Sequence, residues 1–395
     1  MELETFREQV VEWLEANCPQ SQRQPVRANE LVYGGSKVEF PSEDAKLWME
    51  RCAEKGWTAP TWPREYGGGG LSTEENRLLQ KEMKRMACRA PLTGHGLWML
   101  GPALLEFGTE AQKLEHLPRI VRGEVRWCQG YSEPGAGSDL ASLRCRAEDQ
   151  GDHFIVNGQK MWTTYADKAD WIFTLVRTNI DAPKKQMGIS FLLIDMSLPG
   201  VSVKPVPLID GSEHFCDTFF DNVKVPKSQL VGELDGGWSV AKGLLVHERA
   251  MMSQLQKYMP KLPYHIVEYA YRYGETSGGR LANFELRYKL ANHLMNKHAM
   301  GLSHKRAYEE GKAGLLDPGS VSYFKGFATE EDKRGDEILI EILGVKGLGW
   351  EGDSFDPDAE LAATRQMLLS KALSIGGGTT EIQWNIVAKQ LGLPE

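Results

Sequence analysis

Apolar residues recur at helical spacing over the first 125 or so residues of the chain. Phe6, Val10 and Leu14 follow the repeat of three to four residues that is typical of an amphipathic helix, and the stretch from 97 to 105 repeats it. Between these stretches, prolines and glycines from Pro60 to Gly70 interrupt the pattern and indicate a long loop. Residues 1–125 are therefore expected to form a helical N-terminal domain.

The pattern changes to that of β-strands between about residues 126 and 235. The segments Phe154-Ile155-Val156 and Lys160-Met161-Trp162 flank Asn157-Gly158, a pair that favours a type I′ hairpin turn. Further strands are expected at 170–176, 189–194, 201–206 and 218–225, with a turn at Pro199-Gly200. This region, 126–235, is predicted to be a β-domain, a barrel or a sandwich.

Helical periodicity returns at Gly237 and continues to the end of the chain. The expected helices span 238–258, 264–273, 281–311, 319–343, 360–373 and 380–391. The order of helices, strands and then helices, without βαβ alternation or a GxGxxG motif, argues against a Rossmann nucleotide site. The prediction is an α+β protein whose residues 236–395 form a C-terminal helical domain.

Charge and cysteine usage narrow the functional classes. A net charge of -8 argues against nucleic acid as the main partner, and no run of about 18 apolar residues predicts a membrane span. The first helix lacks the basic start of a signal peptide. The six scattered cysteines contain no CxxC pair, which is typical of reduced thiols in the cytoplasm and predicts no metal site.

Two segments at the ends of expected strands combine hydroxyls, glycines and an aromatic ring. In Gln129–Asp139, free N–H groups and hydroxyls in a glycine-rich loop could hold an anionic or carbonyl-bearing ligand, although an ordinary Pro-Gly turn has the same composition. In Trp162-Thr163-Thr164, the indole could stack on a planar ring while the hydroxyls bind its edge. A tryptophan in a strand, however, is often a core residue.

A third segment places three glycines before a helix. Gly376 to Gly378 precede Thr380-x-x-Gln383, which fits a capping box. A helix N-terminus that backbone can approach freely is a suitable cradle for an anion or a carbonyl. A plain capped helix remains the alternative.

Glu248 is the one charged residue on an apolar helical stripe. The other members of the stripe are Ala241, Leu244, Leu245, Met251, Met252 and Leu255. A carboxyl group in an apolar environment titrates at higher pH, as a general base that works near neutrality requires. Alternatively, Glu248 pairs with a buried arginine and has a structural role.

Together these segments resemble the acyl-CoA dehydrogenase family, and the likeness runs nearly end to end. The motifs are GWTAPTWPREYGGGGLS at 56–72, GPALLEFGTEAQK at 101–113, YSEPGAGSD at 131–139, VNGQKMWTT at 156–164, DTFFDNVKVP at 217–226, LVGELDGGW at 230–238, HERA at 247–250 and GGGTTEIQ at 376–383. The resemblance implies a helical N-terminal domain, a middle β-domain and a C-terminal four-helix bundle, with FAD between the last two. It also implies α,β-dehydrogenation of an acyl-CoA thioester, with electron-transferring flavoprotein as the electron acceptor.

Site residues follow from the same resemblance, position by position. The residues that would contact FAD are Gln129, Tyr131, Ser132, Ser138, Trp162, Thr163, Thr164, Gly378, Thr379 and Glu381. Ser138, Arg249 and the backbone N–H of Gly377 would position and polarise the thioester. Many relatives carry their catalytic base where this chain has Gly377, but the isovaleryl and long-chain branches carry it at the position of Glu248. Glu248 is therefore the expected base.

The positions that hold the FAD of a neighbouring subunit differ from the family pattern. Relatives have Arg-Phe-Gly, a glutamine and a Gln-x-x-Gly-Gly segment where this chain has Arg272-Tyr273-Gly274, Phe284 and Glu341 to Val345. A glutamate would repel a pyrophosphate, and Val345 adds bulk. We therefore expect a second, related subunit in an α2β2 heterotetramer, similar to the two-subunit enzymes of bacterial steroid side-chain degradation, with a bulky or branched acyl substrate.

Two other functions remain open at this stage. An acyl-CoA oxidase would reoxidise its flavin with oxygen, although oxidases of this superfamily are usually longer. A non-catalytic subunit would use Glu248 only structurally and should tolerate loss of the loop at 133–138, which is nevertheless complete in this chain.

Overall fold

A computed structural model describes residues 3–26, 30–245, 262–316 and 319–393 of the chain. Contacts divide the chain into two compact units. The first, here called the sheet unit, comprises Met1–Val206 and Glu213–Pro260; the second, the helical unit, comprises Pro207–Ser212 and Lys261–Glu395. The predicted domain boundaries at 125 and 235 remain a prediction.

The sheet unit begins with helices packed through their apolar stripes. These are α1 (Leu3–Asn17), α2 (Glu43–Glu54), α3 (Thr73–Arg85), a π-helical turn (Gly96–Leu100), α4 (Gly101–Phe107) and α5 (Glu110–Val121). The predicted stripe of α1 is buried against Trp48 of α2 and Leu79 of α3. Side-chain caps at Ser72 and Thr109 fix where α3 and α5 begin.

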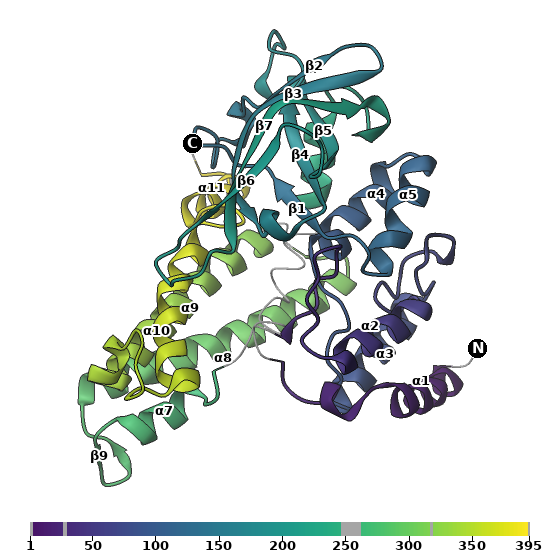
Figure 1. The fold of residues 1–395 in the computed structure, drawn as a ribbon. Coiled ribbons are helices and arrows are strands. Elements are labelled where there is room, and N and C mark those ends of the chain that lie inside the picture. Colours follow the sequence, from purple (N-terminus) through teal and green to yellow (C-terminus); the bar gives the residue numbers. More distant parts are fainter. Residues whose placement is uncertain (1–2, 27–29, 246–261, 317–318, 394–395) are drawn as a thin grey trace. The chain divides into compact units, whose positions relative to one another are not determined.

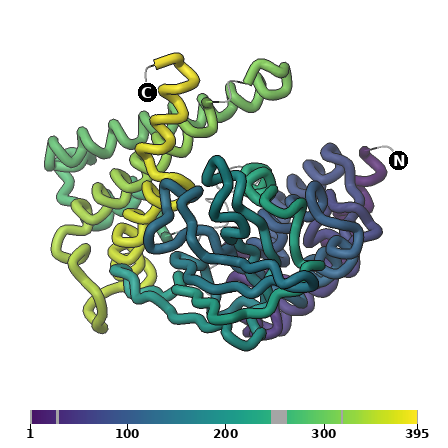
Figure 2. The backbone as a smooth tube through the Cα atoms, turned by 90° about the horizontal axis from the view of Figure 1, so that it is seen from above, coloured from purple at the N-terminus to yellow at the C-terminus, as the bar shows by residue number. Residues whose placement is uncertain are grey.

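An eight-stranded mixed sheet follows. Its strands are β1 (Trp127–Gly130), β2 (Arg146–Asp149), β3 (His153–Thr164), β4 (Trp171–Arg177), β5 (Ile189–Asp195), β6 (Val201–Val206), β7 (Phe215–Pro226) and β8 (Leu230–Val231). The order is β6-β7-β3-β2-β4-β5-β8, and β1 lies parallel to β4. In both views the teal strands lie beside the purple and blue helices of the same unit (Figures 1 and 2).

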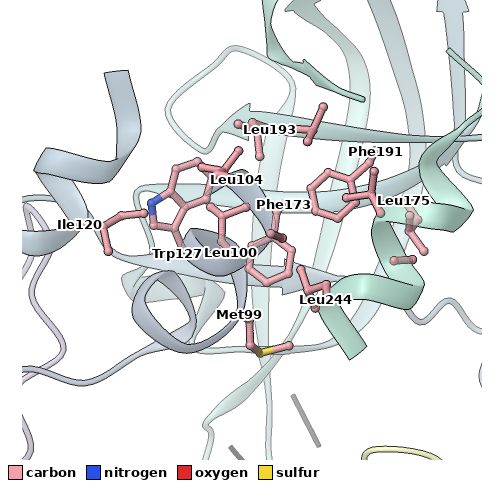
Figure 3. Close-up of a cluster of buried hydrophobic side chains, with 14 of the residues drawn as sticks. Met99, Leu100, Leu104, Ile120, Trp127, Phe173, Leu175, Phe191, Leu193 and Leu244 are labelled. Carbon is pink, nitrogen blue, oxygen red and sulfur yellow. The ribbon is translucent and has the colours of Figure 1, made fainter. Parts of the chain in front are cut away.

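Strand β4 is buried on both faces, and its alternating side chains enter two cores. Phe173 and Leu175 pack against α4, α5 and Leu244 in one core (Figure 3). Ile172 and Val176 pack against β3 and β7 in the other. The sheet therefore has strands on one side of β4 and helices on the other, as the predicted barrel or sandwich with helical neighbours requires.

The predicted hairpin at Asn157-Gly158 was wrong. Strand β3 runs without a turn from His153 to Thr164, and its register with β7 shifts between Val156 and Gly158. The Asn157 Oδ1 accepts a hydrogen bond from the Asn222 N–H at 2.8 Å, so the pair forms an irregularity inside a long strand. Gly158 is required because a Cβ there would lie 2.7 Å from the Cys145 Cα.

The helix predicted from 238 begins at residue 237 and is described to residue 245. Ala241 and Leu244 are fully buried in the same core as Phe173 and Tyr131, and Leu245 packs at its edge. The first members of the predicted apolar stripe are therefore confirmed as core residues.

The helical unit matches the predicted helices closely. Its elements are α7 (Ile266–Tyr273), the short hairpin β9 (Thr276–Ser277) and β10 (Arg280–Leu281), α8 (Phe284–Lys312), α9 (Ser320–Leu343), α10 (Ala362–Ser370) and α11 (Thr380–Gln390). α7, α8, α10 and α11 each contact α9. Tyr269, Leu290, Ile338 and Ala363 are among the residues of its core. The helical C-terminal architecture is thus confirmed.

Two observations bear on the chain as a whole. The six cysteines are free thiols, and five of them are buried. In the described ranges, no helix is both long and apolar enough to span a membrane.

Candidate functional site

A buried ion pair organises the glycine-rich loop that follows β1. Lys160 of β3 is fully buried, and its ammonium lies 2.7 Å from the Glu133 Oε1 and 3.2 Å from the Tyr131 carbonyl oxygen. The Glu133 carboxylate also accepts hydrogen bonds from the main-chain N–H groups of Arg144 at 2.6 Å and Cys145 at 2.9 Å. These three donors compensate the desolvation of the carboxylate and fix the loop to the sheet.

The tip of this loop is a tight turn. Glu133 and Ala136 exchange two main-chain hydrogen bonds of 3.0 Å, and Ala136 is buried. Gly135, inside the turn, and Ser138, beyond it, are exposed. The turn therefore presents the Ser138 hydroxyl to solvent, where a ligand can reach it.

The two predicted motifs of the sheet unit lie side by side. The Met161 N–H donates to the Ser132 carbonyl at 2.9 Å, and the Thr174 hydroxyl donates to the Gly130 carbonyl at 2.6 Å. Gln129 and Ser132 are half-buried on and after β1, whereas Tyr131 is buried, edge-on to Phe173 and Phe191. The Tyr131 ring is therefore a core residue, and its main chain belongs to the loop.

The three candidate residues at the end of β3 differ in their exposure to solvent. Trp162 is 50% exposed, has a φ of 58° and lies where the register with β7 shifts. Thr164 is half-buried, but Thr163 is fully buried, and its hydroxyl has no hydrogen-bond partner among the described residues. The side chains of Trp162 and Thr164 can reach a ligand from solvent, whereas Thr163 could contribute only its main chain.

In the helical unit, the glycine segment is held by side chains that donate to its carbonyls. The Gln383 Nε2 lies 3.1 Å from the Gly377 oxygen and 3.4 Å from the Gly378 oxygen, and the Lys325 ammonium lies 2.7 Å from the Gly378 oxygen. Gly377 and Gly378 have φ values of 67° and 87°, a region that favours glycine. The Gly377 and Gly378 carbonyl oxygens thus already accept hydrogen bonds from side chains of the helical unit itself.

The predicted capping box was wrong by one residue. The N-cap of α11 is Thr379, whose hydroxyl accepts from the Ile382 N–H at 3.3 Å. Thr380 instead donates to the Glu330 carboxylate at 3.1 Å. Glu381 is exposed in the first turn, where its own N–H and the Thr379 hydroxyl lower the pKa of its carboxyl.

Glu248 and Arg249, the predicted base and thioester contact, lie outside the described residues. The described structure reaches residue 245 of the helix before them. Their roles therefore remain predictions from the sequence and the family resemblance.

The segments that differ from the family pattern for holding the FAD of a neighbouring subunit carry exposed side chains. Phe284 is 70% exposed and Val345 80% exposed, and the guanidinium of Arg272 lies 3.9 Å from the centroid of the Tyr264 ring. Both Glu341 carboxylate oxygens lie 3.0 Å from the Lys289 ammonium, which offsets the repulsion expected from this glutamate. The bulk of Val345 is thus a better reason for a changed contact than the charge of Glu341.

Two residues that organise the site were not predicted. Lys160 shares the inward side of β3 with Phe154 and Val156, so strand alternation alone would have placed it in the core. A lysine in such a position needs a carboxylate partner, and Glu133 was available in the other motif. Gln383 had no comparable signal because it was interpreted as a capping residue.

The chain matches three domain families across most of its length. These are the acyl-CoA dehydrogenase N-terminal domain at residues 1–124, the middle domain at 128–223 and the C-terminal domain at 235–392. The chain therefore belongs to the acyl-CoA dehydrogenase family, as its motifs predicted, and is an acyl-CoA dehydrogenase.

Within the family, its relatives include one whose description refers to steroids. It is 33% identical to acyl-CoA dehydrogenase IpdE1 of Mycobacterium tuberculosis, over all of this chain and 98% of that one. Among solved structures, the Tcur3481-Tcur3483 steroid ACAD is similar with a TM-score of 0.73 and 29% identity, over 100% of this chain and 98% of that one. The ChsE4-ChsE5 complex of M. tuberculosis is similar with a TM-score of 0.71 and 28% identity, over 100% and 98%.

Proposed function

We propose that this chain is the flavin-bearing subunit of a heteromeric acyl-CoA dehydrogenase that acts on a bulky or branched acyl group, such as a steroid side chain. The observation that carries the proposal is the loop at 130–139, which is complete in sequence and held by the buried Glu133–Lys160 pair. A subunit that had lost its cofactor would have no need to keep this arrangement.

The residues present fit FAD, which the family generally binds. Trp162 and Thr164 offer an exposed aromatic face beside a hydroxyl, and Gln129, Ser132 and Ser138 add polar groups on neighbouring elements. In the helical unit, Gly378, Thr379 and Glu381 surround the start of α11, and a helix N-terminus suits phosphate or ribityl oxygens. When bound, FAD would supply the hydride acceptor.

The chain's own residues would then activate the substrate. Glu248 would take the proton from Cα of the thioester, and the Gly377 N–H would donate to the thioester carbonyl oxygen, which lowers the pKa of that Cα–H. Ser138 and Arg249 would position the CoA ester. The positive φ of Gly377 and Gly378 favours glycine at both positions. Because glycine has no Cβ, the segment leaves room for a bulky acyl group.

The heteromer is supported by the exposed Phe284 and Val345 at positions where relatives hold a neighbouring cofactor. The ChsE4-ChsE5 complex and the Tcur3481-Tcur3483 structure have two different names in their descriptions, which is consistent with two chains. A second, related chain would supply the missing contacts in an α2β2 tetramer. Electron-transferring flavoprotein would accept the electrons.

The first experiment measures flavin content and subunit stoichiometry. We expect the chain to hold FAD only when it is co-expressed with a related partner, at one FAD per pair, by absorbance and native mass spectrometry. A homotetramer of this chain alone with one FAD per subunit would refute the heteromer and leave an ordinary dehydrogenase.

The second experiment tests the base with Glu248→Gln. Turnover of an acyl-CoA with an artificial electron acceptor should fall about a hundred- to ten-thousand-fold, the usual contribution of a general base. FAD content should be unchanged, and Glu233→Gln, which alters an exposed glutamate, should keep full turnover. Full turnover by the Glu248 variant would instead favour a structural role for Glu248.

A separate peroxide assay tests the oxidase alternative. Release of peroxide in air by the wild-type protein would indicate an acyl-CoA oxidase.

A further inference from the structure

Arg126 lies against a pair of neighbouring tyrosine rings just before β1. Its guanidinium carbon is 4.3 Å from the centroid of the Tyr33 ring and 4.7 Å from that of Tyr165, and the two ring centroids are 5.5 Å apart. The rings therefore cover one side of the guanidinium, and within the described ranges its N–H groups have no hydrogen-bonded side-chain or main-chain acceptor. A half-buried cation with free N–H donors is an incomplete arrangement.

The Asp167 carboxylate attracts the Arg126 guanidinium electrostatically without forming an ion pair among the described residues. The other nearby carboxylate, that of Asp170, is engaged elsewhere. The Asp170 carboxylate accepts from the main-chain N–H of Arg126 at 2.7 Å and from the main-chain N–H of Ser36 at 3.1 Å. It also accepts from the Ser36 hydroxyl. Asp170 therefore anchors the loop at 34–37 to the start of β1 and does not serve the Arg126 side chain.

A small cavity opens beside Arg126. Its volume of about 10 Å³ admits one water-sized group, and Tyr33, Thr93 and His95 help to line it. Thr93 is only 4% exposed, and its hydroxyl has no partner in the part of the chain that the structure describes. No carboxylate lines the cavity, so a guanidinium and a buried hydroxyl face it without an anionic acceptor.

The ionisation of the lining favours an acceptor as occupant. Burial raises the pKa of Tyr33 to about 12, so its hydroxyl keeps its proton near neutral pH. Burial and the nearby Arg126 cation lower the pKa of His95 to about 4, so the imidazole is neutral. Arg126 therefore gives the lining its positive charge, and Thr93 is a free hydroxyl donor, whereas the Tyr33 hydroxyl is hydrogen-bonded to Tyr165.

The cavity is close to the candidate cofactor residues of the same unit. Arg126 is three residues from Gln129, roughly 10 Å along the chain at the rise of a strand, and Tyr165 follows Thr164 directly. His95 immediately precedes the π-helical turn Gly96–Leu100, an irregularity that is frequent at functional sites.

We infer that Arg126, with Thr93, forms a subsite for an acceptor oxygen, a carboxylate or a ketone, at the distal end of the acyl group. The inference rests on the proposed function, because it assigns a substrate feature to that same site. A carboxylate should bind more tightly than a ketone because its hydrogen bonds to a guanidinium are charge-assisted.

The test compares three CoA thioesters that differ at one position: 3-cyclohexylpropionyl-CoA and its 4-oxo and 4-carboxy derivatives. Dissociation constants are measured by calorimetry on the flavin-loaded enzyme without an electron acceptor, and kcat/KM with one. The wild type should prefer the 4-carboxy form about 10- to 100-fold over the unsubstituted form. Arg126→Met, which keeps an apolar chain against the tyrosine rings, should abolish the preference and leave the unsubstituted thioester unaffected.

Two further variants provide a control and a second test of the subsite. Arg146→Met removes an exposed arginine of β2 and should keep the preference, whereas Thr93→Val should reduce it about threefold to tenfold without loss of folding. If Arg126→Met does not fold, an unchanged preference in Thr93→Val overturns the subsite.

The outcomes separate the two proposals. Equal affinity of the wild type for all three thioesters, or no binding of any, overturns the subsite whatever the turnover. A preference that Arg126→Met abolishes, in a protein that turns over none of the three, supports the subsite and contradicts the dehydrogenase assignment of these substrates.

Discussion

The two segments proposed to hold the cofactor are stabilised in different ways. The loop at 130–139 in the sheet unit depends on charge: a fully buried lysine reaches a carboxylate that two main-chain N–H groups also bind. The segment at 376–379 in the helical unit contains no charged residue, and the Gln383 amide and the Lys325 ammonium bind its carbonyls.

This difference predicts that the two segments respond differently to amino-acid substitutions. Removing one partner of a buried ion pair leaves the other desolvated, so the first loop should tolerate no single change at its centre. The second segment depends on backbone conformation, so it should be sensitive to any Cβ at its positive-φ positions and less so to a lost donor. Each contrast can be tested with paired variants.

The largest effect is expected from Lys160→Met. The change leaves the Glu133 carboxylate buried without its cation, which costs about 3–5 kcal/mol of unfolding free energy. Urea denaturation followed by circular dichroism would measure it. Replacing both partners, as Lys160→Met with Glu133→Gln, should recover part of the loss.

Lys185→Met provides the matched control for that prediction. Its ammonium pairs with Asp139 of the same loop at 3.0 Å, but both side chains are more than 60% exposed. An exposed pair contributes at most about 1 kcal/mol. Equal effects of the two lysine variants would show that burial is not what makes the Glu133 pair important.

The next largest effect is expected from Gly378→Ala. Its φ of 87° is strained for alanine, and the new Cβ would lie 2.7 Å from the Gln383 Nε2, so a cost of about 2 kcal/mol is expected. Gly376→Ala is the control, because its Cβ would meet only the Ala372 oxygen at an ordinary 3.6 Å. Differential scanning calorimetry should separate the two, and a similar small change in both would mean that the segment adapts freely.

The helices were predicted more accurately than the turns because their signal extends over many residues. The expected helix at 319–343 is α9, Ser320–Leu343, whereas Asn157-Gly158 was interpreted as a hairpin turn. A local Asn-Gly pair has the same composition in a turn and in a strand irregularity. Only the contact with Asn222, 65 residues away, distinguishes them.

For the site, sequence motifs identified the segments but not the orientation of each side chain. Trp162 and Thr164 are accessible and Thr163 is buried, although all three belong to one motif. Alternation along β3 could have identified Lys160 as an inward residue but not Thr163, because the register shift between Lys160 and Thr163 breaks the alternation. The contacts of Gln383 could not be predicted, because they depend on the conformation of the glycines before α11.

The smallest effect is expected from Gln383→Leu. The substitution removes the amide that donates to the Gly377 and Gly378 carbonyls but keeps a buried side chain of similar size, since Gln383 is only 4% exposed. The Lys325 ammonium still binds the Gly378 oxygen, so the Gly377 oxygen loses its donor at a cost of about 1 kcal/mol. Gln390→Leu, at an exposed position of the same helix, should change the unfolding free energy by no more than about 0.5 kcal/mol. If Gln383→Leu were as harmful as Lys160→Met, the glycine segment would depend on its side-chain donor as strongly as the first loop depends on its ion pair, and the contrast between them would fail.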